Sequence, residues 1–159
     1  MKVLIVSNMQ NGFLKTQNAR SIVFDVNERI TECMKDGYEV CFLRYGNDRD
    51  FVMGTRSWEI TDAIDTSAWN FINTKSKFSY PAENWKERLG TEVESIEICG
   101  LFLDTSILAN AVILKFAYPD IPVMVNLDLC ADFNTARHEA SIESMKKEDI
   151  LCLKGVTNE

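Results

Sequence analysis

Apolar positions change their spacing along the chain, and the change predicts strands separated by helices. Residues 2–7 form a continuous apolar run, typical of a central parallel strand buried on both faces. Residues 18–36 carry apolar side chains three or four positions apart, which predicts a helix that stops at Gly37. Residues 38–43 are again mostly apolar, so the chain opens with a β-α-β unit and a right-handed parallel crossover.

The same pattern continues to the end of the chain. Further strands are expected at residues 69–73, 95–99, 122–126 and 150–153. Further helices are expected from Pro81 to Gly90, from near Asp104 to Tyr118, and from Asn134 to about Lys147. We therefore predict a single α/β domain over residues 1–159, a three-layer α/β/α sandwich around a mostly parallel six-stranded sheet.

The junction between strand 95–99 and the following helix is the stretch best suited to chemistry. Gly100 ends the strand, Asp104 has the side chain to cap the helix, and Ser106 falls in the first helical turn. Unpaired N–H groups and a partial positive charge at a helix N-terminus stabilise a nucleophile or an anionic intermediate. Because α/β proteins build sites at the carboxyl ends of their strands, Ser106 is a candidate site residue.

Composition and charge exclude several classes of partner. The net charge is −7, and the clustered basic residues that a nucleic-acid groove requires are missing, so no nucleic-acid partner is expected. No apolar run reaches the length of a membrane span, and the first run is too short for a signal peptide, so no membrane partner is expected.

The cysteines and the histidine bear on metal binding and location. Five cysteines without a C-x-x-C pair are typical of reduced thiols in the cytoplasm, which is where we place the protein. His138 is the single histidine, and one histidine without paired cysteines argues against a zinc site. We expect neither a metal nor another cofactor.

Five motifs, in order along nearly the whole chain, resemble the isochorismatase-like superfamily, the cysteine hydrolases that include nicotinamidases. Residues 3–13 (VLIVSNMQNGF) resemble its first strand and D-M-Q-N-D-F, and residues 54–60 (GTRSWEI) are similar to G-T-x-G-W-E-I of small bacterial members. Residues 75–79 (KSKFS) resemble K-x-x-Y/F-S. Residues 100–111 (GLFLDTSILANA) resemble the segment of the nucleophilic cysteine, and residues 130–141 (CADFNTARHEAS) resemble C-A-G…H-x-A-A/S-L.

The resemblance implies three catalytic positions. Lys75 matches the family's lysine, with Lys77 as an alternative, whereas Asn8 falls on its aspartate and Ser106 on its nucleophilic cysteine. It also implies a pocket between the carboxyl ends of the first and fourth strands, and a homo-oligomer, either a dimer or a tetramer. Nicotinamidase-like relatives hold a metal with histidines in the region that corresponds to residues 44–68, which contain none here.

The two altered positions change the expected chemistry. A serine hydroxyl is far less acidic than a thiol and needs a base within reach, and the amide of Asn8 cannot accept a proton. Our leading hypothesis is therefore a degraded catalytic triad in a protein that binds or sequesters a small planar or anionic metabolite without hydrolysing it. The residues expected to bind this ligand, besides the triad positions, are Phe13, Trp58, Leu101, Phe102, Thr105 and Asn110.

Two alternatives remain open at the level of sequence. In the first, a residual amide or ester hydrolase uses Ser106 as nucleophile and Lys75 as base, because a desolvated, unpaired lysine can accept a proton. In the second, the protein is structural, and its own side chains or oligomer contacts fill the pocket. The missing histidines and the atypical Phe102 and Leu103 indicate natural divergence rather than an engineered substrate trap.

Overall fold

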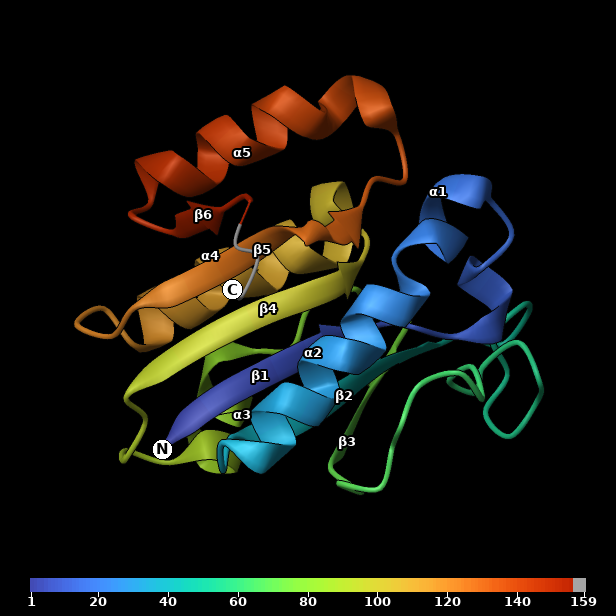
Figure 1. The fold of residues 1–159 in the computed structure, drawn as a ribbon, viewed down its shortest axis with the longest axis horizontal. Coiled ribbons are helices and arrows are strands. Elements are labelled where there is room, and N and C mark those ends of the chain that lie inside the picture. Colours follow the sequence, from blue (N-terminus) through green and yellow to red (C-terminus); the bar gives the residue numbers. More distant parts are fainter. Residues whose placement is uncertain (156–159) are drawn as a thin grey trace.

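The computed structural model describes residues 1–155, which form a six-stranded parallel sheet with helices on both faces (Figure 1). The strands are β1 (Lys2–Ser7), β2 (Glu39–Gly46), β3 (Phe71–Lys75), β4 (Ser95–Leu101), β5 (Val123–Ala131) and β6 (Leu151–Leu153). The helices are α1 (Gln17–Ser21), α2 (Val23–Lys35), α3 (Ala82–Leu89), α4 (Leu108–Ala117) and α5 (His138–Lys147). The predicted α/β sandwich is confirmed; the last four residues of the predicted domain, 156–159, lie outside the described residues.

The strand order in the sheet is β3-β2-β1-β4-β5-β6. The direction in which successive strands are added changes between β1 and β4, although the two strands are parallel. From β1 the chain builds outward to β3, and it then returns to add β4, β5 and β6 on the other side (Figure 1). Ser7 lies opposite Gly100 in the register, so the carboxyl ends of β1 and β4 are level. A parallel sheet opens a crevice at such a switch point, which is where α/β proteins bind ligands.

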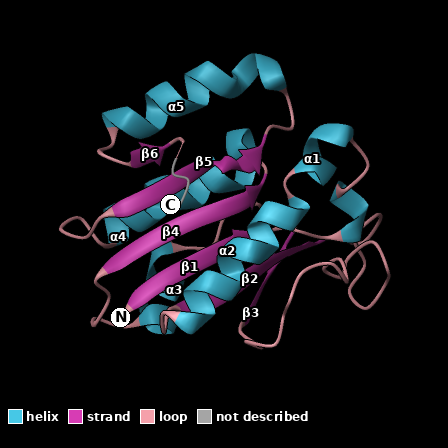
Figure 2. Ribbon diagram, viewed as in Figure 1, coloured by secondary structure: helices cyan, strands magenta, loops and turns pink. Residues whose placement is uncertain are grey.

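Each face of the sheet has its own hydrophobic core. Val3 and Ile5 of β1 contribute to the core beneath α3, α4 and α5, whereas Leu4 and Val6 contribute to the core beneath α1 and α2. The two layers of helices are seen on either side of the strands in Figure 2. The continuous apolar run at residues 2–7 follows from this burial on both faces.

Several element boundaries differ from the sequence prediction. The helix expected over residues 18–36 is divided into α1 and α2 at Ile22, and Thr16 caps α1 by accepting a hydrogen bond from the N–H of Ala19. The third strand starts at Phe71, because Trp69 has a positive φ of 53° that a strand does not accommodate. The fifth strand extends to Ala131 because an irregularity in its pairing with β4, between Ile98 and Gly100, lets pairing resume further along.

The prediction that Asp104 caps the helix after β4 is wrong. After β4 the chain first forms a π-helical turn, η2 (Leu103–Ile107), whose N-terminus has no side-chain cap. The carboxylate of Asp104 instead accepts hydrogen bonds from the backbone N–H groups of Phe133, at 2.8 Å, and Asn134, at 3.0 Å. Asp104 therefore connects this turn to the loop that follows β5, which is distant in the sequence and which the pattern of residues near Asp104 does not indicate.

Candidate functional site

Ser7 and Ser106 meet at the carboxyl ends of β1 and β4. Ser7 is the last residue of β1, and its Oγ lies 2.7 Å from the carbonyl oxygen of Leu101 and 3.0 Å from the Oγ of Ser106. Both serines are buried, and Ser106 is only 1% exposed. The turn η2 thus holds Ser106 against the end of β1, at the switch point of the sheet.

The hydroxyl of Ser106 has its hydrogen-bonding capacity used within the chain. Its Oγ donates to the carbonyl oxygen of Phe78 at 2.9 Å. It also lies 3.3 Å from the Nδ2 of Asn110, which donates to it. A serine hydroxyl has a single proton to donate, so this contact with Phe78 engages the proton that a catalytic base would have to remove. We refer to Ser7, Phe78, Ser106 and Asn110 as the Ser106 centre.

Asn110 locks the segment before α3 onto the start of α4. Its Oδ1 accepts a hydrogen bond from the N–H of Tyr80 at 2.9 Å, and its Nδ2 donates to the carbonyl oxygens of Phe78, at 2.9 Å, and Ser106, at 2.8 Å. The side chain is fully buried. Asn110 was predicted to bind ligand, and the structure brings it next to Ser106 with its amide engaged by the backbone.

Asn8, the residue after Ser7, contributes an unpaired side-chain amide beside this centre. Its backbone has a positive φ of 50°, its N–H donates to the carbonyl of Leu43 at 3.0 Å, and its own carbonyl accepts from the N–H of Gln10 at 2.7 Å. The residue is 3% exposed, and its side-chain amide forms no hydrogen bond with the residues that the structure describes. Among the described residues, the fully buried polar side-chain atoms without a partner belong to other residues, so the amide of Asn8 keeps contact with solvent and its donors and acceptor are open to a ligand.

The structure does not bring Lys75 to the Ser106 centre. Lys75 ends the edge strand β3, its side chain is 73% exposed, and its Nζ lies 3.2 Å from the Oδ1 of Asp48, which is itself 82% exposed. The alternative lysine, Lys77, is also exposed.

Aromatic side chains gather around the carboxyl ends of the strands. We call Phe13, Tyr45, Phe51, Phe78 and Phe102 the aromatic cluster. The ring of Phe13 stacks on Phe51, with centroids 4.2 Å apart, and meets Phe102 edge-on at 5.5 Å. The ring of Tyr45 stacks on Phe78 at 4.5 Å. Phe13 and Phe102, both predicted to be walls of a pocket, therefore contact each other.

The remaining predicted ligand residues have different surroundings. Leu101 is fully buried in the core beneath α1 and α2, and the peptide bond between Leu101 and Phe102 is cis. Thr105 lies in η2, and its Oγ1 is buried without a hydrogen-bond partner among the described residues. The ring of Trp58 is packed against the guanidinium of Arg44, at 4.1 Å from Cζ to the ring centroid.

Several residues of this region were not found from the sequence. Gln10 is fully buried, and its Nε2 donates to the carbonyl oxygens of Tyr45, at 2.8 Å, and Trp58, at 2.7 Å. Ser7 had a recognisable signal, a polar residue that closes an apolar strand. Phe78 had none, because it acts on Ser106 through its backbone carbonyl, which every residue possesses.

His138 and Asp132 form a pair next to the loop after β5. The Nδ1 of His138 lies 2.9 Å from the Oδ2 of Asp132. Burial raises the pKa of Asp132, and the charge of Asp104 adds to this effect, while His138 opposes it. Within residues 1–155 no group of three or more His, Cys, Asp and Glu side chains is arranged to hold a metal ion. None of the helices in this part of the chain is long and apolar enough to cross a membrane.

The comparisons with known proteins agree on the fold. The model of the Isochorismatase domain matches residues 2–154. The pyrazinamidase of Pyrococcus horikoshii in complex with zinc has a TM-score of 0.80 at 19% identity, covering 96% of this chain and 98% of that one. PnC1 from L. infantum in complex with nicotinate has a TM-score of 0.80 at 14% identity, with coverages of 97% and 92%.

A third solved structure extends the comparison. The yeast nicotinamidase Pnc1p bound to the inhibitor nicotinaldehyde has a TM-score of 0.79 at 14% identity, with coverages of 97% and 100%. No curated protein matches the sequence. The zinc of the pyrazinamidase does not fit this chain, since residues 44–68 contain no histidine and the described residues offer no suitable cluster.

Proposed function

The chain belongs to the isochorismatase domain family, and on that premise we propose that it binds a small planar or anionic metabolite without hydrolysing it. The binding site we propose lies at the carboxyl ends of β1 and β4. The observation that carries the proposal is the hydrogen bond from the Oγ of Ser106 to the carbonyl of Phe78, at 2.9 Å, in a residue that is 1% exposed. A serine nucleophile would instead have to present its proton to a base.

The position of Lys75 also argues against hydrolysis. A mechanism with serine as nucleophile and lysine as base requires the two side chains to be within hydrogen-bond reach. The ammonium group of Lys75 is instead next to Asp48 and largely in solvent. This geometry supports a binding protein over the residual hydrolase.

Asn8 and the aromatic cluster support binding. The Asn8 amide forms no hydrogen bond with the described residues and keeps contact with solvent, so it has donors and an acceptor to offer a ligand. Phe13 and Phe102 provide apolar ring faces and edges of the kind that line small-molecule sites. A neutral amide at the position of the family's aspartate also removes a negative charge that would repel an anion.

Titration with nicotinate and nicotinaldehyde, followed by calorimetry, tests the binding. We expect nicotinate to bind the unmodified protein and to bind Asn8→Ala about tenfold more weakly, the loss of one well-placed hydrogen bond to a charged ligand. Asn84→Ala, which alters an asparagine of α3, is the matched control and should leave binding unchanged.

Ammonia release from nicotinamide and pyrazinamide tests the absence of hydrolysis. We expect none above the uncatalysed rate from the unmodified protein or from Ser106→Ala. Release that Ser106→Ala abolishes would establish the residual hydrolase and overturn the proposal. Failure of both ligands to bind at millimolar concentration would favour the structural alternative, in which the aromatic cluster fills the pocket.

A further inference from the structure

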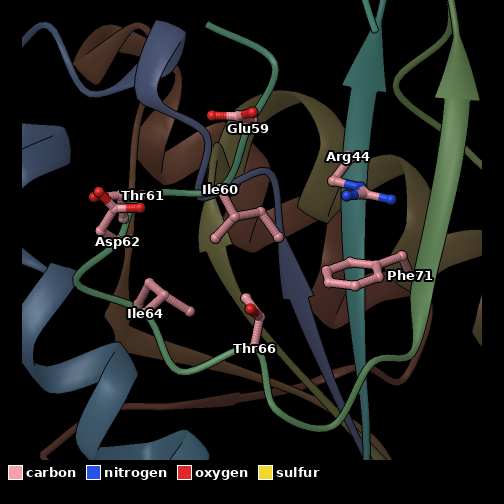
Figure 3. Close-up of a pocket in the computed structure, with 8 residues that line it drawn as sticks. All are labelled: Arg44, Glu59, Ile60, Thr61, Asp62, Ile64, Thr66 and Phe71. Carbon is pink, nitrogen blue, oxygen red and sulfur yellow. The ribbon is translucent and has the colours of Figure 1, made fainter. Parts of the chain in front are cut away.

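A pocket lies on the face of β2 that carries the side chain of Arg44. It has a volume of about 330 Å³ and is formed between β2, the first residue of β3 and the segment 59–66, which runs beside β2 (Figure 3). Its lining residues are Arg44, Glu59, Ile60, Thr61, Asp62, Ile64, Thr66 and Phe71, and we call it the Arg44 pocket. Successive side chains of a strand point to opposite faces, so Arg44 lines this pocket while Tyr45 joins the aromatic cluster.

The guanidinium of Arg44 lies over two aromatic rings. Its Cζ lies 3.9 Å from the ring centroid of Phe71 and 4.1 Å from that of Trp58. Figure 3 shows the guanidinium directly over the Phe71 ring, at the side of the pocket. The rings leave the edge of the guanidinium open, and this edge carries its N–H donors.

Most of that edge has no partner among residues 1–155. The Nε of Arg44 donates to the Oδ1 of Asn73 at 2.8 Å. The terminal nitrogens, Nη1 and Nη2, have no hydrogen bond or ion pair with any residue in the described part of the chain. Arg44 is half-buried, and this burial lowers its pKa without an acidic neighbour to oppose the effect.

Another half-buried arginine on the same side of the sheet is fully paired. Arg29 of α2 contacts the carboxylate of Glu97 through Nε, at 3.1 Å, and Nη2, at 2.6 Å, and contacts Glu32 through Nη1 at 3.0 Å. A planar guanidinium with two adjacent N–H groups matches a carboxylate in this bidentate way. Arg44 presents the same groups without the carboxylate.

The rest of the Arg44 pocket suits a small apolar body. The side chains of Ile60 and Ile64 point toward the side where Arg44 and Phe71 lie, and Thr66 stands at its foot (Figure 3). Glu59 and Asp62 are exposed at the rim. The volume is at the lower end of the range for ligand sites, which restricts the occupant to a small molecule.

We propose that the Arg44 pocket binds a small organic carboxylate, whose carboxylate group pairs with Nη1 and Nη2 of Arg44 and whose apolar body packs on Ile60 and Ile64. The missing counter-charge, the open edge of the guanidinium and the apolar wall all point to this class of ligand. The site is separate from the one proposed at Asn8, and it does not depend on that proposal.

The probe is 3-methylbutanoate, and its neutral control is 3-methylbutanamide, which has the same branched body without the charge. We expect calorimetry to detect binding of the acid and at least about tenfold weaker binding of the amide, because a bidentate charged pair is replaced by a neutral contact. Amide NMR signals of residues 59–66 should shift during titration with the acid. Equal binding of acid and amide, or no binding of the acid at 10 mM, would overturn the proposal.

Variants locate the binding. Arg44→Met should weaken binding of the acid at least about tenfold, whereas Arg49→Met, at an exposed arginine in the loop after β2, should leave it unchanged. Glu59→Gln removes a negative charge from the rim without touching the packing of Arg44, and it should tighten binding about twofold at low salt. Asn8→Ala should have no effect. Equal binding by Arg44→Met and Arg49→Met, or no tightening by Glu59→Gln, would contradict the assignment.

Discussion

The Ser106 centre and the Arg44 pocket both lie toward the carboxyl ends of the strands, but they differ in how their polar groups are paired. In the Ser106 centre the hydroxyl of Ser106 and the amide of Asn110 are engaged by other groups of the chain. In the Arg44 pocket the terminal nitrogens of Arg44 have no partner among the described residues. Polar groups that the chain itself pairs hold the fold together, whereas polar groups left unpaired are available to a ligand.

Arg29 and Arg44 offer the sharpest form of this comparison. Glu97 is 4% exposed in its side chain, so Arg29→Met would leave a buried carboxylate without its partner and should cost about 3–5 kcal/mol of unfolding free energy. Arg44→Met leaves no acid unpaired; it loses its ring contacts and an exposed hydrogen bond to Asn73, at about 1 kcal/mol. Urea unfolding monitored by circular dichroism measures both. Equal losses would mean that Arg44, like Arg29, is a structural residue.

A methyl group at Gly100 tests how tightly β4 is packed against β1 in the Ser106 centre. Gly100 has a φ of +106°, and a Cβ there would lie 2.4 Å from the carbonyl oxygen of Ser7. Gly100→Ala should therefore cost about 3 kcal/mol or more, since a backbone clash adds to the conformational penalty. Gly90→Ala is the control: its φ is +74° with nothing near the added methyl, so about 1 kcal/mol is expected. A Gly100→Ala protein as stable as the control would show that the two strands can separate.

Removal of the Asn110 amide breaks the pairing of the Ser106 centre directly. Asn110→Ala leaves the N–H of Tyr80 without its acceptor and should cost about 2–3 kcal/mol in thermal or urea unfolding. Asn84→Ala on α3, whose side chain forms no hydrogen bond with the described residues, should change stability by less than about 0.5 kcal/mol. A small effect of Asn110→Ala would mean that water replaces the lost contacts and that the centre is open.

Each of the two hydrophobic cores contains a buried cysteine whose titration at alkaline pH should lower the stability of the fold. Burial raises the pKa of the Cys33 thiol, in the core beneath α2, and of the Cys41 thiol, in the opposite core, from 9.0 to about 12. The unfolded chain releases these protons at lower pH than the folded chain does, so the free energy of unfolding falls as the pH rises from about 9 toward 12. Well below pH 9 both states keep these protons, and the thiols do not change the stability. By pH 10 these two thiols together should cost about 3 kcal/mol, at up to 1.4 kcal/mol per pH unit for each, and the thiols of Cys99 and Cys130, whose pKa values burial also raises, add to this loss.

Alkylation by iodoacetamide at pH 9, read by mass spectrometry, checks the same groups. Cys33 and Cys41 should stay unmodified in the folded protein and react fully in urea. Rapid modification of either thiol in the folded state would show that its core opens to solvent.

The smallest effect is expected at Lys75. Its ion pair with Asp48 is exposed at both ends, so Lys75→Ala should change the unfolding free energy by less than about 0.5 kcal/mol, and by less still at high salt. Nicotinate binding should also persist in this variant if Lys75 stays in solvent when the ligand is bound. A large loss of binding would show that Lys75 moves to the ligand and restores part of the family's arrangement.

Much of the fold was predictable because its signals are local. Strands buried on both faces require continuous apolar runs, such as residues 2–7, and the motif from Gly100 to Ala111 identified the family. The boundary errors have local causes as well, such as the positive φ at Trp69, which residue type alone does not indicate. The prediction for Asp104 was wrong because its carboxylate accepts hydrogen bonds from N–H groups of the loop after β5 instead of from the helix that follows it.

The sequence by itself determined the order of strands and helices, the family, and which residue types stand at the family's catalytic positions. The tertiary structure decided which partner each polar group has. Ser106 donates to a backbone carbonyl, Lys75 extends into solvent, and Arg44 lies over two rings. The reason is physical: a hydrogen bond depends on positions to within a few tenths of an ångström, and those positions are set by segments distant in the chain.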